Sequence, residues 1–158
     1  MIKRAIIGIL IFLVGVATAV LLEQSLRVFI QDLYKSLSGQ SIYFVGKDFN
    51  LFASPIYYCS FGILALVLWS ATAKAEKKGS IALLLLTAVA FFTALIVICF
   101  IDSHLKLAQC TACFDGRRGL HYNDINYDFI QVLSILIALL PSLKRFWTKV
   151  RMPAPNKV

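Results

Sequence analysis

The chain has 158 residues, of which 59% are hydrophobic and 15% are charged, and its formal net charge is +8. A composition with so many apolar residues excludes an ordinary soluble domain. No segment between the apolar runs is long enough to hold a second core, so we expect a single domain over residues 1–158. A strongly basic chain can indicate a nucleic-acid partner. Here the cations gather beside the apolar runs, which excludes nucleic acid and points to membrane topology.

Four long runs without any Asp, Glu, Lys, Arg or His lie between the charged segments: Ala5–Leu22, Phe49–Ala73, Ile81–Ile101 and Phe129–Leu143. A helix that crosses the hydrocarbon core of ~30 Å needs roughly 20 apolar residues. The second and third runs have that length, the first is marginal, and the fourth must be completed by its neighbours. We predict an all-α membrane protein, a four-helix transmembrane bundle at about residues 5–22, 51–73, 81–101 and 127–147.

The distribution of Lys and Arg predicts the orientation. The N terminus, the turn after the second run and the tail after the fourth hold ten of the sixteen cations and a single acid, Glu76. The remaining loops, at about residues 23–50 and 102–126, hold six cations and six acids, and a seventh acid, Asp128, follows the second loop. Because cytoplasmic segments retain Lys and Arg, we expect an integral, multi-pass plasma (inner) membrane protein. Both termini would be cytoplasmic and both long loops outside, with membrane lipids as partners.

The first run has an alternative interpretation as a cleaved signal peptide. Basic residues precede it, and Ala17-Thr18-Ala19 has the small-residue pattern of a cleavage site. Val20–Leu22 continue the apolar run beyond that site, which favours a retained helix. Within the run, Gly15 and Ala19 form a small-residue pair of the kind that allows close helix contact.

The first outer loop contains an amphipathic stretch. Apolar residues recur at helical spacing at Leu22, Leu26, Phe29, Leu33 and Leu37. This pattern predicts either an extension of the first helix or a second helix on the outer membrane surface. After it, Ser41–Val45 is prone to form a strand.

Helix starts are signalled by capping residues. Ser54 followed by proline predicts a helix that begins at Pro55, Ser80 predicts the start of the third helix, and Asp128 predicts the start of the fourth. The apolar runs carry hydroxyls and amides but no Asp, Glu, Lys, Arg or His, which argues against a path for a charged solute. Their hydroxyls are expected to bond to their own helix backbone.

The second outer loop holds Cys110 and Cys113, for which three interpretations stay open. The first is a structural disulfide between the two, because the outside of the membrane is oxidising. The second is thiol–disulfide exchange, for which C-x-x-C is the minimal dithiol. Cys59 and Cys99 would lie in the same leaflet and could pass electrons on to a quinone.

With this helix count, topology and set of outer-facing cysteines, the chain resembles the four-helix quinone-linked disulfide oxidases. Those proteins carry an active C-x-x-C near the first helix pair and a second cysteine pair. The resemblance implies electron transfer from the thiols to a quinone. This chain departs from the pattern, because its first outer loop has no cysteine and its second holds both Cys110 and Cys113.

The third interpretation is a zinc site. His104, Cys110, Cys113 and His121 supply two imidazoles and two thiolates, a chemically adequate ligand set. Their spacing differs from that of the common zinc fingers, and oxidation competes for the thiols.

The remaining polar residues of the second loop suggest a docking surface. We expect binding residues at Arg117, Arg118, His121 and Tyr122, where cations and an aromatic side chain stand close together. The leading hypothesis is a non-catalytic accessory, interaction or immunity-type protein that binds another membrane or extracytoplasmic protein through its outer loops. The alternative is a quinone-linked thiol–disulfide oxidoreductase.

Overall fold

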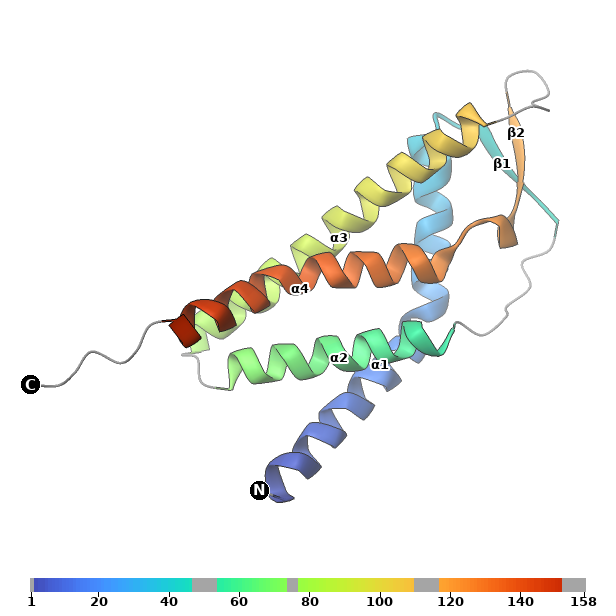
Figure 1. Cartoon of the computed structure of the whole chain (residues 1–158). Helices are drawn as coiled ribbons and strands as arrows, with labels where there is room; N and C mark the ends of the chain where they lie inside the picture. Colours follow the sequence, from blue (N-terminus) through green and yellow to red (C-terminus); the bar gives the residue numbers. More distant parts are fainter. Residues whose placement is uncertain (1, 47–53, 74–76, 110–116, 152–158) are drawn as a thin grey trace, which may run out of the picture.

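The computed structural model describes residues 2–46, 54–73, 77–109 and 117–151 (Figure 1). Within this part of the chain, four helices account for most of the residues, as the sequence predicts. In chain order the elements are α1 (Ile2–Leu37), β1 (Ile42–Val45), α2 (Pro55–Thr72), α3 (Lys77–Ala108), β2 (Arg118–His121), the 3-10 turn η1 (Tyr122–Asp124) and α4 (Tyr127–Arg151).

The helices α1 and α3 are longer than their apolar runs. The amphipathic stretch of the first loop is not a separate helix, because α1 continues without interruption to Leu37. No glycine or proline interrupts the chain between residues 16 and 38, and the helix ends just before Gly39, which adopts a positive φ of 59°. The predicted cap at Ser80 is wrong, since α3 already begins at Lys77.

The start of α2 is confirmed. Ser54 is its N-cap, and the Ser54 hydroxyl accepts a hydrogen bond of 3.4 Å from the Tyr57 amide. Pro55 occupies the first helical position, where its missing N–H group costs nothing.

Three of the described helices are long and apolar enough to cross a membrane: α1, α2 and α3 from Gly79 onward. The apolar part of α4, Tyr127–Leu143, is shorter. Large aliphatic side chains such as Ile9, Leu13, Leu85 and Leu136 are exposed along these helices. A surface of this kind is suited to lipid and costly in water, which is consistent with insertion into a membrane.

We call the apolar helical region the bundle: residues 2–22 of α1, all of α2, residues 79–94 of α3 and residues 131–143 of α4. Figure 1 shows α2 and α4 side by side, with α1 changing direction beside the start of α2. The predicted small-residue contact is present at Gly15 and Ala19, which are both buried. A Cβ atom on Gly15 would lie 2.6 Å from the Phe61 carbonyl oxygen, so α1 and α2 touch through their backbones.

At the other end lies a second packed unit, which we call the cap: residues 23–37 of α1, β1, residues 95–108 of α3, β2, η1 and the first turn of α4. The two strands pair in parallel, with Ile42 opposite Arg118 and Val45 opposite His121. The ladder therefore joins the two long loops. Its inner side chains meet the helices in one apolar cluster, whose buried members are Ile30, Tyr34, Ile42, Leu95, Cys99, Leu120, Ile125, Tyr127 and Ile130.

Candidate functional site

A layer of polar side chains separates the cap from the bundle. Glu23 on α1 accepts a hydrogen bond of 2.6 Å from the Tyr58 hydroxyl of α2. The Arg27 guanidinium forms a 3.2 Å ion pair with Glu23 and lies 5.2 Å from the ring centre of Tyr127 on α4. Arg27 is buried, and a buried cation needs such partners because its desolvation costs several kcal/mol. The layer thus ties three helices together where their apolar runs end.

Asp128 extends this layer to the start of α2. Its carboxylate accepts a 2.8 Å hydrogen bond from the Ser54 amide. The prediction that Asp128 caps α4 is wrong, because α4 begins at Tyr127 and the Asn126 side chain accepts the 3.1 Å bond from the Phe129 amide. Asp128 therefore joins two helices that are adjacent in space, and it leaves the capping of its own helix to Asn126.

Within the cap, polar contacts again run between elements. The Gln31 amide donates a 3.0 Å hydrogen bond to the Tyr127 hydroxyl. The Tyr34 hydroxyl donates to the Asp102 carboxylate on α3. Burial raises the pKa of Tyr34, and the neighbouring Asp102 charge raises it further, so Tyr34 stays a neutral donor. Lys106 lies 3.9 Å from Asp102 and is part of the same contact.

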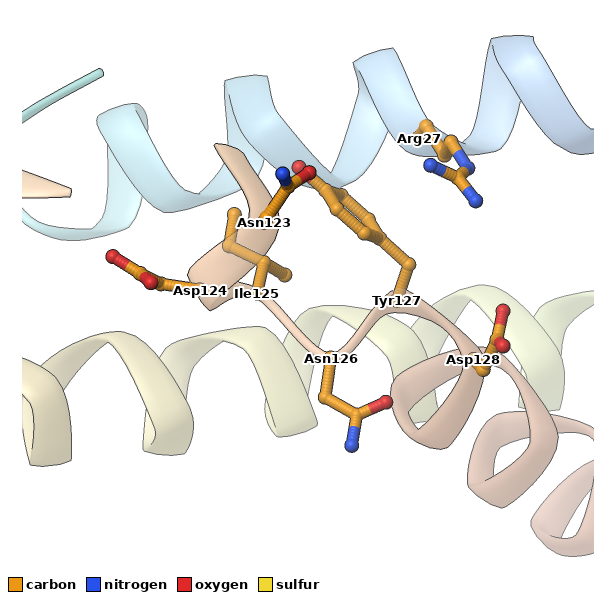
Figure 2. Close-up of a pocket in the computed structure, with 7 residues that line it drawn as sticks. All are labelled: Arg27, Asn123, Asp124, Ile125, Asn126, Tyr127 and Asp128. Atoms are coloured by element: carbon orange, nitrogen blue, oxygen red, sulfur yellow. The ribbon is translucent and has the colours of Figure 1, made fainter. Parts of the chain in front are cut away.

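An open pocket of about 500 Å³ lies beside the polar layer. Figure 2 shows the Arg27 guanidinium and the Asp128 carboxylate pointing into the space beside the Tyr127 ring. The remaining lining residues come from the segment before α4: Asn123, Asp124, Ile125 and Asn126. The Asp124 and Asn126 side chains accept hydrogen bonds from the His121 and Phe129 amides. The charged groups left to face the pocket are therefore the buried Arg27 and the Asp128 carboxylate, a pair that suits a polar ligand of mixed charge.

The four predicted binding residues lie on one segment but on opposite faces of it. Because side chains alternate along a strand, Arg118 lies on the inner side of β2 and is half buried, whereas His121 at the end of the strand is exposed. Arg117, just before β2, is exposed. Tyr122 stacks on the Phe44 ring at a centroid distance of 4.9 Å, so it also belongs to the packing of the cap.

The exposed face of the ladder includes two residues that the sequence reasoning missed. Tyr43 and Val45 are 46% and 41% exposed. Both lie over Gly119, since a Cβ atom on that glycine would be 3.1 Å from the Tyr43 hydroxyl oxygen and 3.2 Å from a Val45 methyl. The alternation of Ser41–Val45 could have revealed them, because a half-buried strand exposes every second side chain.

Of the four cysteines, Cys110 and Cys113 lie outside the described residues, so the predicted disulfide and its redox alternative stay predictions. Cys59 and Cys99 are free thiols on different helices. Cys59 is exposed on α2, whereas Cys99 is buried in the apolar cluster of the cap. A thiol so enclosed packs as a small apolar side chain.

The zinc hypothesis also depends on Cys110 and Cys113. Its two histidines lie in different elements: His104 is exposed on α3 against the Phe100 ring, and His121 is exposed at the end of β2. Among the described residues, no group of three or more His, Cys, Asp or Glu side chains is placed to hold a metal ion.

No known protein family, curated protein or solved structure matches this chain.

Proposed function

We propose that the protein is a four-span membrane protein whose cap binds another membrane or extracytoplasmic protein, without catalysis of its own. Both termini are cytoplasmic, and the strands and loops of the cap lie outside. The observation that carries the proposal is the exposed face of the β1–β2 ladder. There Tyr43 and Val45 form an apolar patch, with Arg117 and His121 close by.

The chemistry of this face is that of a protein contact. Aromatic and apolar side chains supply the central binding energy of interfaces, and cations at the rim set association rate and register. The cluster beneath the ladder holds the strands in place, so the patch is preorganised and little ordering entropy is lost on binding. In the described part of the chain each strand pairs with one other strand, so an extended partner segment has a strand edge with which to pair.

The four-span arrangement is supported by the polar layer. Glu23, Ser54 and Asp128 each stand where an apolar segment ends or begins, and hydrogen bonds connect them to neighbouring helices at this level. The apolar segments of these three helices therefore end at the same height, as they would at one surface of a membrane. The continuation of α4 to Arg151 would complete its crossing.

Labelling of single cysteines tests the topology. In a background without native cysteines, a cysteine at Ser36 reacts with a membrane-impermeant maleimide in intact cells, since the residue is exposed on the cap. A cysteine at Lys77 reacts only after permeabilisation. Labelling of position 77 from outside would overturn the proposed orientation.

Site-specific photo-crosslinking in native membranes tests the binding function. A photoreactive residue at Val45 gives a discrete protein adduct, and the same residue at Leu21, which is exposed on the bundle, does not. The double variant R117A/H121A lowers the Val45 adduct roughly fivefold, the effect of about 1 kcal/mol. An adduct that is equal from both positions, or unchanged in the double variant, contradicts the proposal.

The oxidoreductase alternative makes a different prediction in the same cells. Exchange through C-x-x-C passes through a mixed disulfide with the substrate protein. Such a species would be seen on non-reducing gels in the C113S variant and lost in C110S/C113S. Alkylation mass spectrometry on the isolated protein shows whether Cys110 and Cys113 are oxidised, or are thiols that become blocked only with stoichiometric zinc.

A further inference from the structure

A second hollow adjoins the polar pocket. This apolar cleft of about 280 Å³ lies between the start of α2 and the first turns of α4. It is lined by Ser54, Ile56, Asp128, Phe129, Val132, Leu133 and Leu136. Asp128 lines both spaces, so the polar pocket and the apolar cleft meet at this carboxylate.

The polar pocket and the apolar cleft together match an amphiphilic molecule, with a polar end and an apolar end. From Asp128 the cleft follows α4 for eight residues to Leu136, which is ~12 Å of helix. One leaflet of the hydrocarbon core is about 15 Å thick. The cleft therefore has the depth of an acyl chain, and the polar pocket begins where the headgroup of that lipid would lie.

The charges of the pocket define which headgroup fits. Arg27 is more than nine-tenths buried yet lines the pocket, where it can donate to a phosphate. Glu23 already pairs with Arg27, and Asp128 adds a second acid, so the site disfavours a headgroup with a net negative charge. Carboxylates accept hydrogen bonds from a primary ammonium group, whereas a trimethylated ammonium group has no proton to donate.

We propose that the pocket and the cleft together bind one phospholipid whose headgroup carries a primary amine. One acyl chain occupies the cleft, the phosphate contacts Arg27, and the ammonium group contacts the Asp128 carboxylate. The site rests on the proposed insertion of the helices into a bilayer, which the labelling at positions 36 and 77 tests separately. It is independent of the protein-binding face, because it uses none of the side chains of the β1–β2 ladder.

Native mass spectrometry of the full chain in detergent, after removal of lipid, measures binding. The probes are phosphatidylethanolamine, phosphatidylcholine and phosphatidylglycerol with identical acyl chains. We expect phosphatidylethanolamine to bind about tenfold more tightly than the other two, the effect of one charge-assisted hydrogen bond. The D128N variant loses this preference, although asparagine can still accept the bond from the Ser54 amide.

Two matched leucine variants test the cleft. Leu136 and Leu140 lie one turn apart on α4 and are 54% and 59% exposed, but only Leu136 lines the cleft. L136W fills the cleft and lowers phosphatidylethanolamine binding, whereas L140W leaves it unchanged. Equal binding of the three lipids, or equal effects of the two tryptophans, overturns the proposal. A quinone that is purified one per chain and lost in L136W would also overturn it.

Discussion

The Ser and Thr hydroxyls of the bundle and the long polar side chains of the cap use their hydrogen bonds differently. At the boundary between the two regions, Tyr57 and Tyr58 of α2 also donate across, to Ala19 and Glu23 of α1. In the bundle, Thr18, Thr87 and Ser134 donate to carbonyls of their own helix, at 2.7 to 2.9 Å. In the cap, Gln31 and Tyr34 donate across to other helices. Bonds within one helix satisfy a polar group but specify no neighbour. Bonds between helices fix which elements meet, so the cap specifies the arrangement of the fold more strongly than the bundle.

Packing shows the same contrast. The bundle exposes most of its aliphatic side chains. Its helices meet through small residues such as Gly15 and Ala19 and through a cluster that includes Tyr57, Phe61 and Ile135. The cap encloses large side chains, with Ile30 and Leu120 almost fully buried. Lipid solvates an exposed aliphatic side chain as well as a protein neighbour does. Burial therefore stabilises the cap, whose strands and loops lie outside the bilayer in the proposed topology, more than it stabilises the bundle.

The largest expected effect comes from two isoleucines of α1. Ile30 in the cap is 0% exposed, and Ile9 in the bundle is 61% exposed. I30A leaves a cavity and lowers the free energy of unfolding by about 2–5 kcal/mol. I9A changes it by less than about 0.5 kcal/mol. Chemical unfolding in mixed micelles measures both. Equal losses would show that the cap and the bundle do not differ in packing.

Hydroxyl deletions sharpen the contrast in hydrogen bonding. Y34F removes the donor to Asp102 and lowers the free energy of unfolding by about 1.5–3 kcal/mol, as for bonds to charged groups. T87V removes a buried hydroxyl whose bond stays within α3, so we expect a change below about 1 kcal/mol. Faster hydrogen exchange at the amides of β2 in Y34F, but not in T87V, would locate the loss in the cap.

The helices can be predicted from the sequence because they depend on local patterns. The apolar runs predict the helices, and the Ser54–Pro55 pair predicts the start of α2 to the residue. The helical spacing of Leu22–Leu37 predicts a helix there, and the structure shows that it is the continuation of α1. In each case the information lies within a few turns of the chain.

The contacts between distant segments could not be predicted in this way. The sequence of Ser41–Val45 predicts a strand, but Arg118–His121 has no strand-like alternation of apolar and polar residues. The pairing of the two strands depends on the apolar cluster that lies beneath them. Asp128 is a good capping residue by local rules. In the structure it accepts from Ser54, because the start of α2 lies beside it in space. The pocket and the predicted binding residues depend on such pairings, so the sequence names residues without showing which of them share a face.

The smallest expected effect comes from the glycines of α1 and tests whether the bundle is held by close backbone contact. A Cβ atom on Gly15 would stand 2.6 Å from the Phe61 carbonyl oxygen, whereas one on Gly8 would meet only a Leu66 methyl at 3.9 Å. G15A must push α2 away from α1 and lowers the free energy of unfolding by about 1–3 kcal/mol. G8A fits without displacement and raises it by up to about 1 kcal/mol, because alanine favours the helix. Chemical unfolding of the two variants in mixed micelles measures the difference. A stabilising G15A would mean that α1 and α2 separate at little cost, and that the cap alone holds the helices together.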